Sequence, residues 1–358
     1  MSEYEAFIGT GPVAAAHAFD VDALQRYLQG HLDGFEGPIE LAQFKGGQSN
    51  PTFVLRTPAK SYVLRRKPPG QLLPSAHAVD REYRVISALA GSDVPVPRAY
   101  VLCTDEAVIG SMFYVMELVE GRILWDPQLP GMVAKERRAI FDEMNRVIAM
   151  LHRVDYAAIG LADYGKQGNY FARQIDRWTR QYKASATEQC EAMDRLIEWL
   201  PLNIPAGEQT AIVHGDYRLD NMIFHPTEPR VLALLDWELS TLGHPMADFS
   251  YHLMTWRLAP TEMRGLRGAD FAALGIPTEQ EYVDRYLARV GATSAPTAAD
   301  WGFYLAYNMF RIAGILQGVK ARALAGNASN ARALEAGNRA RPMAELGWQQ
   351  VEALRAMQ

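Results

Sequence analysis

Hydrophobic and polar residues alternate in short runs over the first hundred or so residues of the chain. These runs cover residues 39–44, 52–56, 61–66, 99–103 and 112–119. Turn-forming residues, among them Gly46, Gly47 and Pro58, separate the runs. Short runs bounded in this way are typical of strands joined by tight turns. We therefore predict a small antiparallel sheet near the N-terminus.

The pattern changes to helical spacing over residues 77–90. Glu82 lies three residues after Val79 and four before Ile86, so these three side chains share the inward face of the predicted helix. A carboxylate on an inward face costs free energy unless a cation pairs with it. We therefore expect a positively charged partner for Glu82.

Beyond Gly121 the chain is mostly helical in pattern, as in the stripe formed by Ile140, Met144 and Val147. A single core usually divides once a chain exceeds ~250–300 residues, and this chain has 358 residues, of which 49% are hydrophobic. We predict an α+β protein of two lobes. A small antiparallel β lobe with one helix covers residues 1–119, and a larger, mostly helical lobe covers residues 120–358.

Charge and composition narrow the classes of partner. The formal net charge of −5 provides no general basic field, which argues against nucleic acid as a partner. The two cysteines, Cys103 and Cys190, are too few for a disulfide framework. No uncharged apolar segment of about 18 residues appears, so we expect no membrane association. We predict a cytoplasmic protein, and the sequence identifies no protein partner.

The most informative stretch, residues 211–238, reads AIVHGDYRLDNMIFHPTEPRVLALLDWE. Two apolar runs, 222–224 and 231–235, flank the turn-rich HPTEPR and predict a β-hairpin. Antiparallel pairing about the centre of that turn places Asn221 opposite Leu235. Asn221 and Asp236 should therefore lie side by side at the open end of the hairpin.

Asp216 lies five residues before Asn221, just after a short apolar run. Two carboxylates and an amide oxygen are the hard oxygen ligands that Mg²⁺ prefers. Phosphoryl transfer needs metal ions to neutralise phosphate charge and an acidic residue that accepts the hydroxyl proton. The spacing of Asp216, Asn221 and Asp236 fits this chemistry. The alternative is that the two aspartates only cap turns of a solvated hairpin.

The HGDYRLDN segment resembles the catalytic loop of aminoglycoside phosphotransferases and choline kinases, which are relatives of the protein kinases. The resemblance implies a protein-kinase-like fold and ATP-dependent transfer of phosphate to a hydroxyl of a small molecule. It makes Asp216 the catalytic base, and Asn221 and Asp236 the ligands of Mg²⁺, with ATP as co-substrate. For His214 it favours bracing of the loop by hydrogen bonds over proton transfer.

The resemblance extends over nearly the whole chain. FKGGQSNPTFVL stands where kinases carry a glycine-rich hairpin over the phosphates, and backbone N–H groups of Gly46, Gly47, Gln48 and Ser49 would contact the nucleotide. An ordinary turn is the alternative. By the same resemblance, the lobe of residues 1–119 covers the nucleotide, and the lobe of residues 120–358 carries the catalytic loop and the acceptor site.

Two further segments resemble parts of the kinase site. YVMELVEG is similar to the interlobe hinge, where Glu117 and Val119 would contact adenine through backbone groups, although a plain strand end is the alternative. In DWELSTLGHPMADFS, Asp248 matches an aspartate that supports the core, which favours structural support over direct catalysis. Glu238 lies two residues after Asp236, so it either assists the metal ligands or has no role at the metal.

The strand SYVLRRK occupies the place of the kinase strand that carries the phosphate-binding lysine, and Arg65 stands at the lysine position. Arginine can bridge phosphate oxygens and pair with Glu82, but its planar fork differs from a point-charge ammonium. A shifted register would give the role to Arg66 or Lys67. An exposed edge strand would leave Arg65 without one.

A narrower resemblance links KPPGQLLPSAHAVDREYRVISAL and LDWELSTLGHP to phosphotransferases that are fused to acyl-CoA dehydrogenases in eukaryotes. It favours a hydroxyacyl-type acceptor, and aromatic residues from Tyr251 onward suit an apolar wall, unless they belong to the core. These are Trp256, Tyr282, Tyr286, Trp301, Tyr304 and Tyr307. Where relatives often read Gly-Asp-Pro, this chain has Gly243-His244-Pro245, so the role of that turn stays open.

Other functions remain as alternatives. An aminoglycoside or another small metabolite is the alternative acceptor. A pseudokinase that binds nucleotide as a regulatory module is favoured only by Arg65 at the lysine position, whereas retention of Asp216, Asn221 and Asp236 argues against it. A protein kinase is disfavoured because no D-F-G or A-P-E segment occurs.

Overall fold

A computed structural model describes residues 8–45, 50–68, 77–326 and 333–356. The chain divides into two compact units. The first unit comprises Met1–Trp125, Ile159–Leu161 and Leu219–Ser240. The second comprises Asp126–Ala158, Ala162–Arg218 and Thr241–Gln358. The hairpin that follows the HGD segment therefore belongs to the first unit, and the HGD segment itself belongs to the second.

The first unit contains an antiparallel sheet in the order β1-β2-β3-β4-β6-β5. The strands are β1 Thr10–Gly11, β2 Glu40–Phe44, β3 Thr52–Arg56, β4 Ser61–Arg66, β5 Ala99–Cys103 and β6 Phe113–Glu117. β4 is a central strand, paired with β3 on one side and β6 on the other. Arg65 therefore lies in the middle of the sheet, which excludes the exposed edge strand that was one alternative for it.

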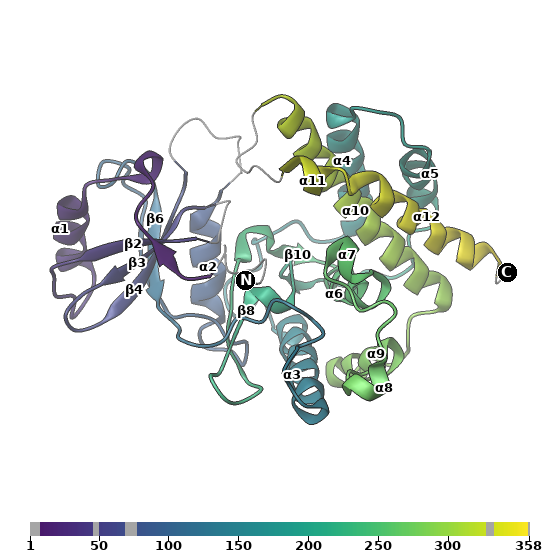
Figure 1. The fold of residues 1–358 in the computed structure, drawn as a ribbon, viewed down its shortest axis with the longest axis horizontal. Coiled ribbons are helices and arrows are strands. Elements are labelled where there is room, and N and C mark those ends of the chain that lie inside the picture. Colours follow the sequence, from purple (N-terminus) through teal and green to yellow (C-terminus); the bar gives the residue numbers. More distant parts are fainter. Residues whose placement is uncertain (1–7, 46–49, 69–76, 327–332, 357–358) are drawn as a thin grey trace. The chain divides into compact units, whose positions relative to one another are not determined.

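Helices α1 (Val21–His31) and α2 (Val79–Leu89) cover opposite faces of this sheet (Figure 1). Leu24 and Leu28 of α1 pack in one apolar cluster with Phe53, Leu55 and Leu64. Successive strand residues point to opposite faces, so Arg65 points to the face that α2 covers. The sequence pattern predicted α2 but not α1.

A second hairpin in the first unit joins β8 (Met222–Phe224) to β9 (Val231–Leu234), as predicted. The short 3-10 helices η4 (Leu219–Asn221) and η5 (Trp237–Leu239) flank it, and α2 contacts η5. The backbone of Gly121 approaches β8 so closely that a Cβ atom there would lie 2.3 Å from the carbonyl oxygen of Phe224. Only glycine fits this position without displacing the hairpin.

The second unit is mainly helical, around the long helix α10 (Ala298–Leu324). α10 contacts α4 (Tyr170–Ser185), α6 (Pro245–Arg257), α11 (Ala333–Gly337) and α12 (Ala340–Ala356). The remaining helices are α3 Ala134–Arg153, α5 Glu191–Trp199, α7 Pro260–Met263, α8 Phe271–Leu274 and α9 Glu279–Val290, with η3 Leu200–Leu202. α6 is apolar and buried on nearly all sides, which is typical of a helix within a core.

The only sheet that the described part of the second unit contains is short. β7 (Ala211–Val213) pairs with β10 (Thr241–Gly243) in antiparallel register, with Val213 opposite Thr241. The catalytic-loop segment begins directly after β7, and α6 begins two residues after β10. The catalytic-loop segment and α6 therefore each follow one strand of this two-stranded sheet.

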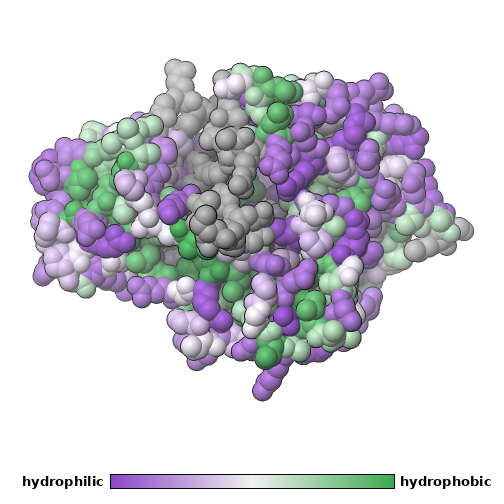
Figure 2. Space-filling view, in the orientation of Figure 1, coloured by the Kyte–Doolittle hydropathy of each residue, from purple (hydrophilic) through white to green (hydrophobic). Residues whose placement is uncertain are grey.

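The surface shows hydrophilic and hydrophobic residues mixed over the visible face (Figure 2). Large exposed apolar side chains occur at scattered positions, including Ile8, Ile123, Val133, Leu202 and Leu324. In the described ranges, no helix has both the length and the hydropathy that crossing a bilayer requires.

Candidate active site

Asn221 and Asp236 are neighbours at the open end of the β8–β9 hairpin. Met222 pairs with Leu234, and the backbone N–H of Leu235 donates to the carbonyl oxygen of Asn221 at 2.8 Å. The predicted register is therefore confirmed. Asp236 adopts a left-handed backbone with φ 64°, which is uncommon for a residue other than glycine and occurs preferentially at functional sites.

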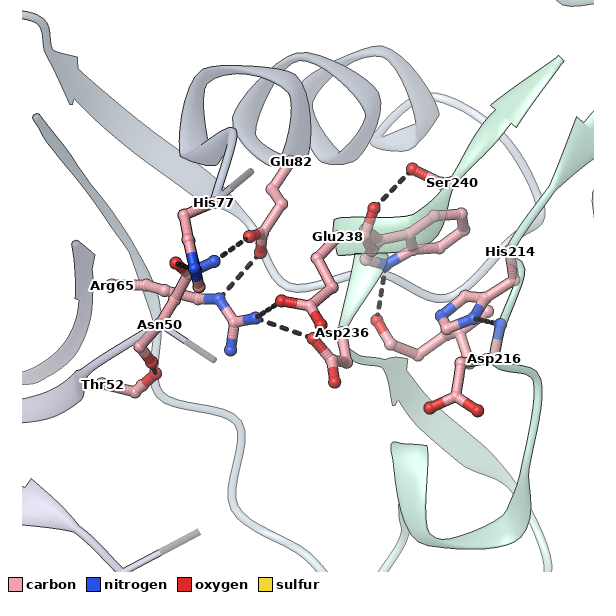
Figure 3. A network of polar contacts seen from close by, with 12 residues as sticks. Asn50, Thr52, Arg65, His77, Glu82, His214, Asp216, Asp236, Glu238 and Ser240 are labelled. Carbon is pink, nitrogen blue, oxygen red and sulfur yellow. Dashed lines mark hydrogen bonds and ion pairs between the residues drawn. The ribbon is translucent and has the colours of Figure 1, made fainter. Parts of the chain in front are cut away.

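Arg65 links β4 to the end of this hairpin within the first unit (Figure 3). Its Nε lies 2.8 Å from Glu82 Oε2, and its Nη2 lies 2.7 Å from Asp236 Oδ1 and 3.6 Å from Glu238 Oε2. The side chain is only 9% exposed. We call Arg65, Glu82, Asp236 and Glu238 the Arg65 cluster. The predicted cationic partner of Glu82 is thus Arg65.

Glu82 is the most buried member of the Arg65 cluster, with a side chain 1% exposed. Burial raises its pKa, against the opposing effect of Arg65. Two donors also hold its carboxylate: Asn50 Nδ2 at 2.8 Å and the hydroxyl of Tyr114 at 3.1 Å. Tyr114 lies opposite Arg65 in the β4–β6 ladder. Asn50 and Tyr114 therefore hold the Glu82 carboxylate in place for its ion pair with Arg65.

The cluster carries more negative than positive charge, because one guanidinium faces three carboxylates. A divalent cation would neutralise this excess. Asn221 and Asp236 carry an amide and a carboxylate oxygen, the donor types that suit Mg²⁺. Within the described residues, no group of three or more His, Cys, Asp or Glu is arranged to hold a metal. The two donors of Asn221 and Asp236 would suit a Mg²⁺ ion that takes its other ligands from phosphates and waters.

The structure describes the predicted hinge segment but not the predicted glycine turn. Gly46, Gly47, Gln48 and Ser49 lie outside the described residues. Glu117 pairs with Tyr62 at the end of the β4–β6 ladder, and Val119 lies two residues beyond it. Asn50, which directly follows Ser49, accepts a hydrogen bond from His77 Nδ1 at 3.0 Å through its side-chain oxygen. The sequence analysis did not predict a role for Asn50.

Asp216 follows β7 in the second unit, and its side chain is 24% exposed. The hydroxyl of Tyr251 donates to Asp216 Oδ1 at 2.5 Å, and Arg218 Nε lies 3.6 Å from the same oxygen. Burial raises the pKa of Asp216, but Arg218, the Tyr251 hydrogen bond, His214 and Arg311 together outweigh it, so the pKa lies below its ordinary value. The carboxylate is therefore ionised at neutral pH.

The backbone of the Asp216 loop, residues 214–218, is braced from two sides. Asp248 accepts hydrogen bonds from the backbone N–H groups of His214 at 2.7 Å and Gly215 at 2.8 Å. Arg311 on α10 donates to the carbonyl oxygen of Gly215 at 2.7 Å. The ring of His214 accepts from the backbone N–H of Asp216 at 3.2 Å (Figure 3). Asp248 and His214 thus contact the loop as braces.

The turn Gly243-His244-Pro245 has a definite structural role. His244 is the N-cap of α6, and its Nδ1 accepts from the backbone N–H of Met246 at 3.2 Å. Burial lowers the pKa of His244 to about 4, so the ring is neutral and its Nδ1 can accept. An aspartate in this place would cap the helix in the same way, so histidine and aspartate can serve the same role in this turn.

The aromatic residues that suggested an acceptor wall belong mostly to the core. Trp256, Tyr282, Tyr286, Tyr304 and Tyr307 are all at most 5% exposed. Their rings pack on one another and on the helices of the second unit, as Tyr282 does on Trp256 at 4.7 Å. Trp256, Tyr282 and Tyr307 thus follow the core alternative that the sequence left open, whereas Tyr286 and Tyr304 also line a cavity.

Sequence reasoning also missed Tyr251 and Arg311, which both contact the Asp216 loop. A signal for Tyr251 was available: it lies three residues after Asp248, so a helix places both on one face. Arg311 had no comparable signal, because it lies about a hundred residues away along the chain.

Solved structures define the class of this fold. A protein from Ralstonia eutropha JMP134, provisionally named an aminoglycoside phosphotransferase, is 59% identical, with a TM-score of 0.86 over 94% of this chain and 99% of that chain. Choline kinase from Cryptosporidium parvum Iowa II shares the fold at 13% identity, with a TM-score of 0.65 over 94% and 97%. A ternary complex of aminoglycoside phosphotransferase APH(4)-Ia with AMP-PNP and hygromycin B has a TM-score of 0.58 at 15% identity, over 92% and 98%. The protein therefore has the protein-kinase-like fold.

The sequence comparison gives the family. Residues 40–298 match the Phosphotransferase enzyme family, and this chain belongs to it. Acyl-CoA dehydrogenase family member 10 of Mus musculus is 47% identical over 97% of this chain and 33% of the relative, and family member 11 of Rattus norvegicus is 42% identical over 95% and 44%. The chain thus spans between a third and a half of the length of these curated relatives. The predicted kinship with phosphotransferases fused to acyl-CoA dehydrogenases is confirmed.

Proposed function

We propose that this protein transfers the γ-phosphate of ATP to a hydroxyl group of a small molecule. The observation that carries the proposal is the Arg65 cluster, in which a buried arginine joins Glu82 to Asp236 beside Asn221. Its excess negative charge suits a metal ion with a bound nucleotide. Family membership and the AMP-PNP complex of a fold neighbour support ATP as the phosphate donor.

Within the first unit, we assign Asn221 and Asp236 to Mg²⁺. When bound, the metal neutralises phosphate charge and orients the nucleotide. Arg65 reaches the phosphates while Glu82 holds its Nε. Arg66, the neighbouring arginine of β4, does not take this place, because its Nε donates to Ser111 Oγ at 2.8 Å. This contact supports Arg65 over Arg66 as the replacement of the kinase lysine.

We assign the remaining nucleotide contacts to other residues of the lobe of residues 1–119. Gly46, Gly47, Gln48 and Ser49 would cover the phosphates through their backbone N–H groups. Backbone groups of Glu117 and Val119 would bind adenine. We assign the catalytic loop and the acceptor site to residues 120–358.

Asp216 is assigned to the acceptor hydroxyl, whose proton it accepts as the phosphoryl group is transferred. Its lowered pKa keeps it ionised at neutral pH. Because the transition state of phosphoryl transfer is loose, orientation of the hydroxyl contributes more than a strong base does. The braces from Asp248 and Arg311 support this role, since they fix the loop backbone on both sides.

For the acceptor we propose a hydroxyacyl compound rather than an aminoglycoside. Arg218 lies near the Asp216 carboxylate, and Arg311 donates to the backbone of the same loop. Two guanidinium groups at this place would repel a polycation. The acyl-CoA dehydrogenase names of the curated relatives support an acyl acceptor. The provisional name of the Ralstonia protein favours an aminoglycoside as the second candidate.

A screen of ATP consumption tests the function. Purified protein with Mg-ATP is offered hydroxyacyl-CoAs, free hydroxy acids, sugars, amino alcohols and aminoglycosides, and product phosphorylation is checked by mass spectrometry. We expect transfer to a hydroxyacyl compound that Asp216→Asn abolishes. Transfer to aminoglycosides alone would overturn the acceptor proposal. Binding of Mg-ATP without transfer to any acceptor would favour the pseudokinase alternative.

A further inference from the structure

Tyr251 makes a contact that the family assignment does not explain. Its hydroxyl donates to Asp216 Oδ1 at 2.5 Å, and the residue is only 7% exposed. A phenol hydroxyl can donate only one hydrogen bond, and Tyr251 donates it to the carboxylate that we assign to the acceptor. α6 therefore contacts the Asp216 loop twice, since Asp248, one helical turn earlier, holds the loop backbone.

Arg311 fixes the tyrosine in turn. The guanidinium carbon lies 5.3 Å from the centroid of the Tyr251 ring and 5.9 Å from that of Trp178. The same guanidinium donates to the carbonyl oxygen of Gly215 at 2.7 Å. A cation over an aromatic face is attracted by the ring quadrupole. Arg311 thus holds both the tyrosine ring and the loop backbone next to Asp216.

We propose that Tyr251 is a positioning residue for phosphoryl transfer, whose hydroxyl holds the Asp216 carboxylate in one orientation while Arg311 holds Tyr251. This inference rests on the proposed function, in which Asp216 meets the acceptor hydroxyl. Asp248 and Arg311 brace the loop backbone, whereas Tyr251 donates to the Asp216 carboxylate itself, and Arg218 lies 3.6 Å from the same oxygen.

The charged and titratable groups around Asp216 are Arg218 and His214 from its own loop, Tyr251 from α6 and Arg311 from α10. Each favours the ionised carboxylate, and a hydrogen bond donated to a carboxylate weakens it as a base. A loose transition state tolerates this loss, because it depends on orientation more than on proton affinity. The arrangement therefore exchanges basicity for a fixed orientation.

The hydrogen bond is testable without any activity, by proton NMR at neutral pH. A buried phenol proton held in a short bond to a partly buried carboxylate should give a downfield, slowly exchanging resonance. We expect Tyr251→Phe to remove that resonance. Tyr282→Phe is the matched control, because Tyr282 is also buried but bonds to His252 at 2.8 Å, and it should keep the resonance. If the wild-type spectrum showed no such resonance, or if Tyr251→Phe left it in place, the proposed contact would be overturned.

Turnover separates positioning from structural support. Tyr251→Phe keeps the ring under Arg311 and deletes only the hydroxyl. With Mg-ATP and the acceptor identified in the screen, we expect kcat to fall about 10- to 100-fold, the cost of a misplaced catalytic group, while the KM for ATP stays unchanged. Tyr282→Phe should retain kcat even if its melting temperature falls equally.

The outcomes distinguish this inference from the proposed function. If the wild type phosphorylates its acceptor and Tyr251→Phe does so at the same kcat, Tyr251 has no positioning role. If the resonance is present but the wild type transfers phosphate to no acceptor, the proposed function fails instead, and the contact is only structural.

Discussion

The Arg65 cluster and the Asp216 loop each present an aspartate just beyond a short strand, but their electrostatic surroundings are opposite in sign. In the Arg65 cluster one guanidinium faces three carboxylates. Around Asp216, two guanidinium groups and a phenol favour a single carboxylate. The first region attracts a further cation, whereas the second keeps one anion ionised and oriented. The same residue type thus suits metal binding in one place and acceptor binding in the other.

The largest expected effect separates the two aspartates. Asp236→Ala should abolish Mg²⁺-dependent nucleotide binding, because it removes a ligand that we propose for the metal. Asp216→Ala should leave Mg-ATP affinity nearly unchanged while it abolishes phosphate transfer. Calorimetric titration of both variants measures the difference. Equal losses of Mg-ATP affinity in two folded variants would show that the division of roles is wrong.

Acid should destabilise α6 and its N-cap, which carry the buried histidines His252 and His244. Burial lowers the pKa of His244 and of His252 from 6.5 to about 4. Both therefore bind protons more weakly in the folded state, so stability is full above pH 6.5 and is lost as the pH falls from 6.5 to about 4. The loss approaches roughly 3 kcal/mol for each histidine.

Hydrogen exchange read by mass spectrometry locates this effect. After correction for the intrinsic pH dependence, peptides from α6 should lose protection between pH 6.5 and 4 before peptides from α2. Glu82 on α2 has a raised pKa, and for an acid this shift favours the folded state as the pH falls. Simultaneous loss of protection in α2 and α6 would mean that the two regions do not respond separately.

Arg65→Ala tests the connection within the first region. Loss of bonds to two carboxylates should raise the KM for ATP and lower kcat, by about 2–3 kcal/mol in kcat/KM. Arg65→Lys should restore part of the activity, because the charge remains although the fork is lost.

The matched control is Arg66→Ala on the opposite face of β4. Arg66 bonds to Ser111 and lies 5.2 Å from the ring centroid of Phe19. Its removal should lower the melting temperature but leave the KM for ATP unchanged. If Arg66→Ala weakened ATP binding and Arg65→Ala did not, the phosphate contact would belong to the other face.

The smallest effect concerns the cap of α6 behind the Asp216 loop. His244→Ala should cost about 1 kcal/mol for the lost N-cap, plus the packing of the ring on Phe171. His244→Asn should cost less, because asparagine is a good N-cap. Urea denaturation compares the two variants. If asparagine and alanine destabilised equally, the capping contact would contribute nothing.

Local patterns predicted the first region well. The bounds of β3, β4 and β5 match their alternating runs, and the hairpin register placed Asn221 beside Asp236 from turn chemistry alone. Glu82 was paired correctly because burial of a carboxylate demands a cation. Helix α1 was missed, since its stripe of Leu24 and Leu28 is short and interrupted by polar residues.

The second region depended on contacts between distant segments. Arg311 reaches Gly215 across 96 residues, and no local pattern encodes such a contact. The aromatic residues of α6, α9 and α10 show the same limit, because helical spacing is the same for a core face and for a pocket wall. Burial assigns Trp256, Tyr282 and Tyr307 to the core, whereas Tyr286 and Tyr304 also line a cavity.

The central claim is that the Arg65 cluster binds nucleotide through a metal, and one comparison tests it most directly. ATP is titrated into the wild-type protein by calorimetry, with Mg²⁺ and then with EDTA, and melting temperatures are recorded in parallel. We predict binding only with Mg²⁺, and stabilisation of ~2.7 kcal/mol at about 100 times the dissociation constant. Equal ATP affinity with and without Mg²⁺, or no binding at millimolar Mg-ATP, would contradict the account.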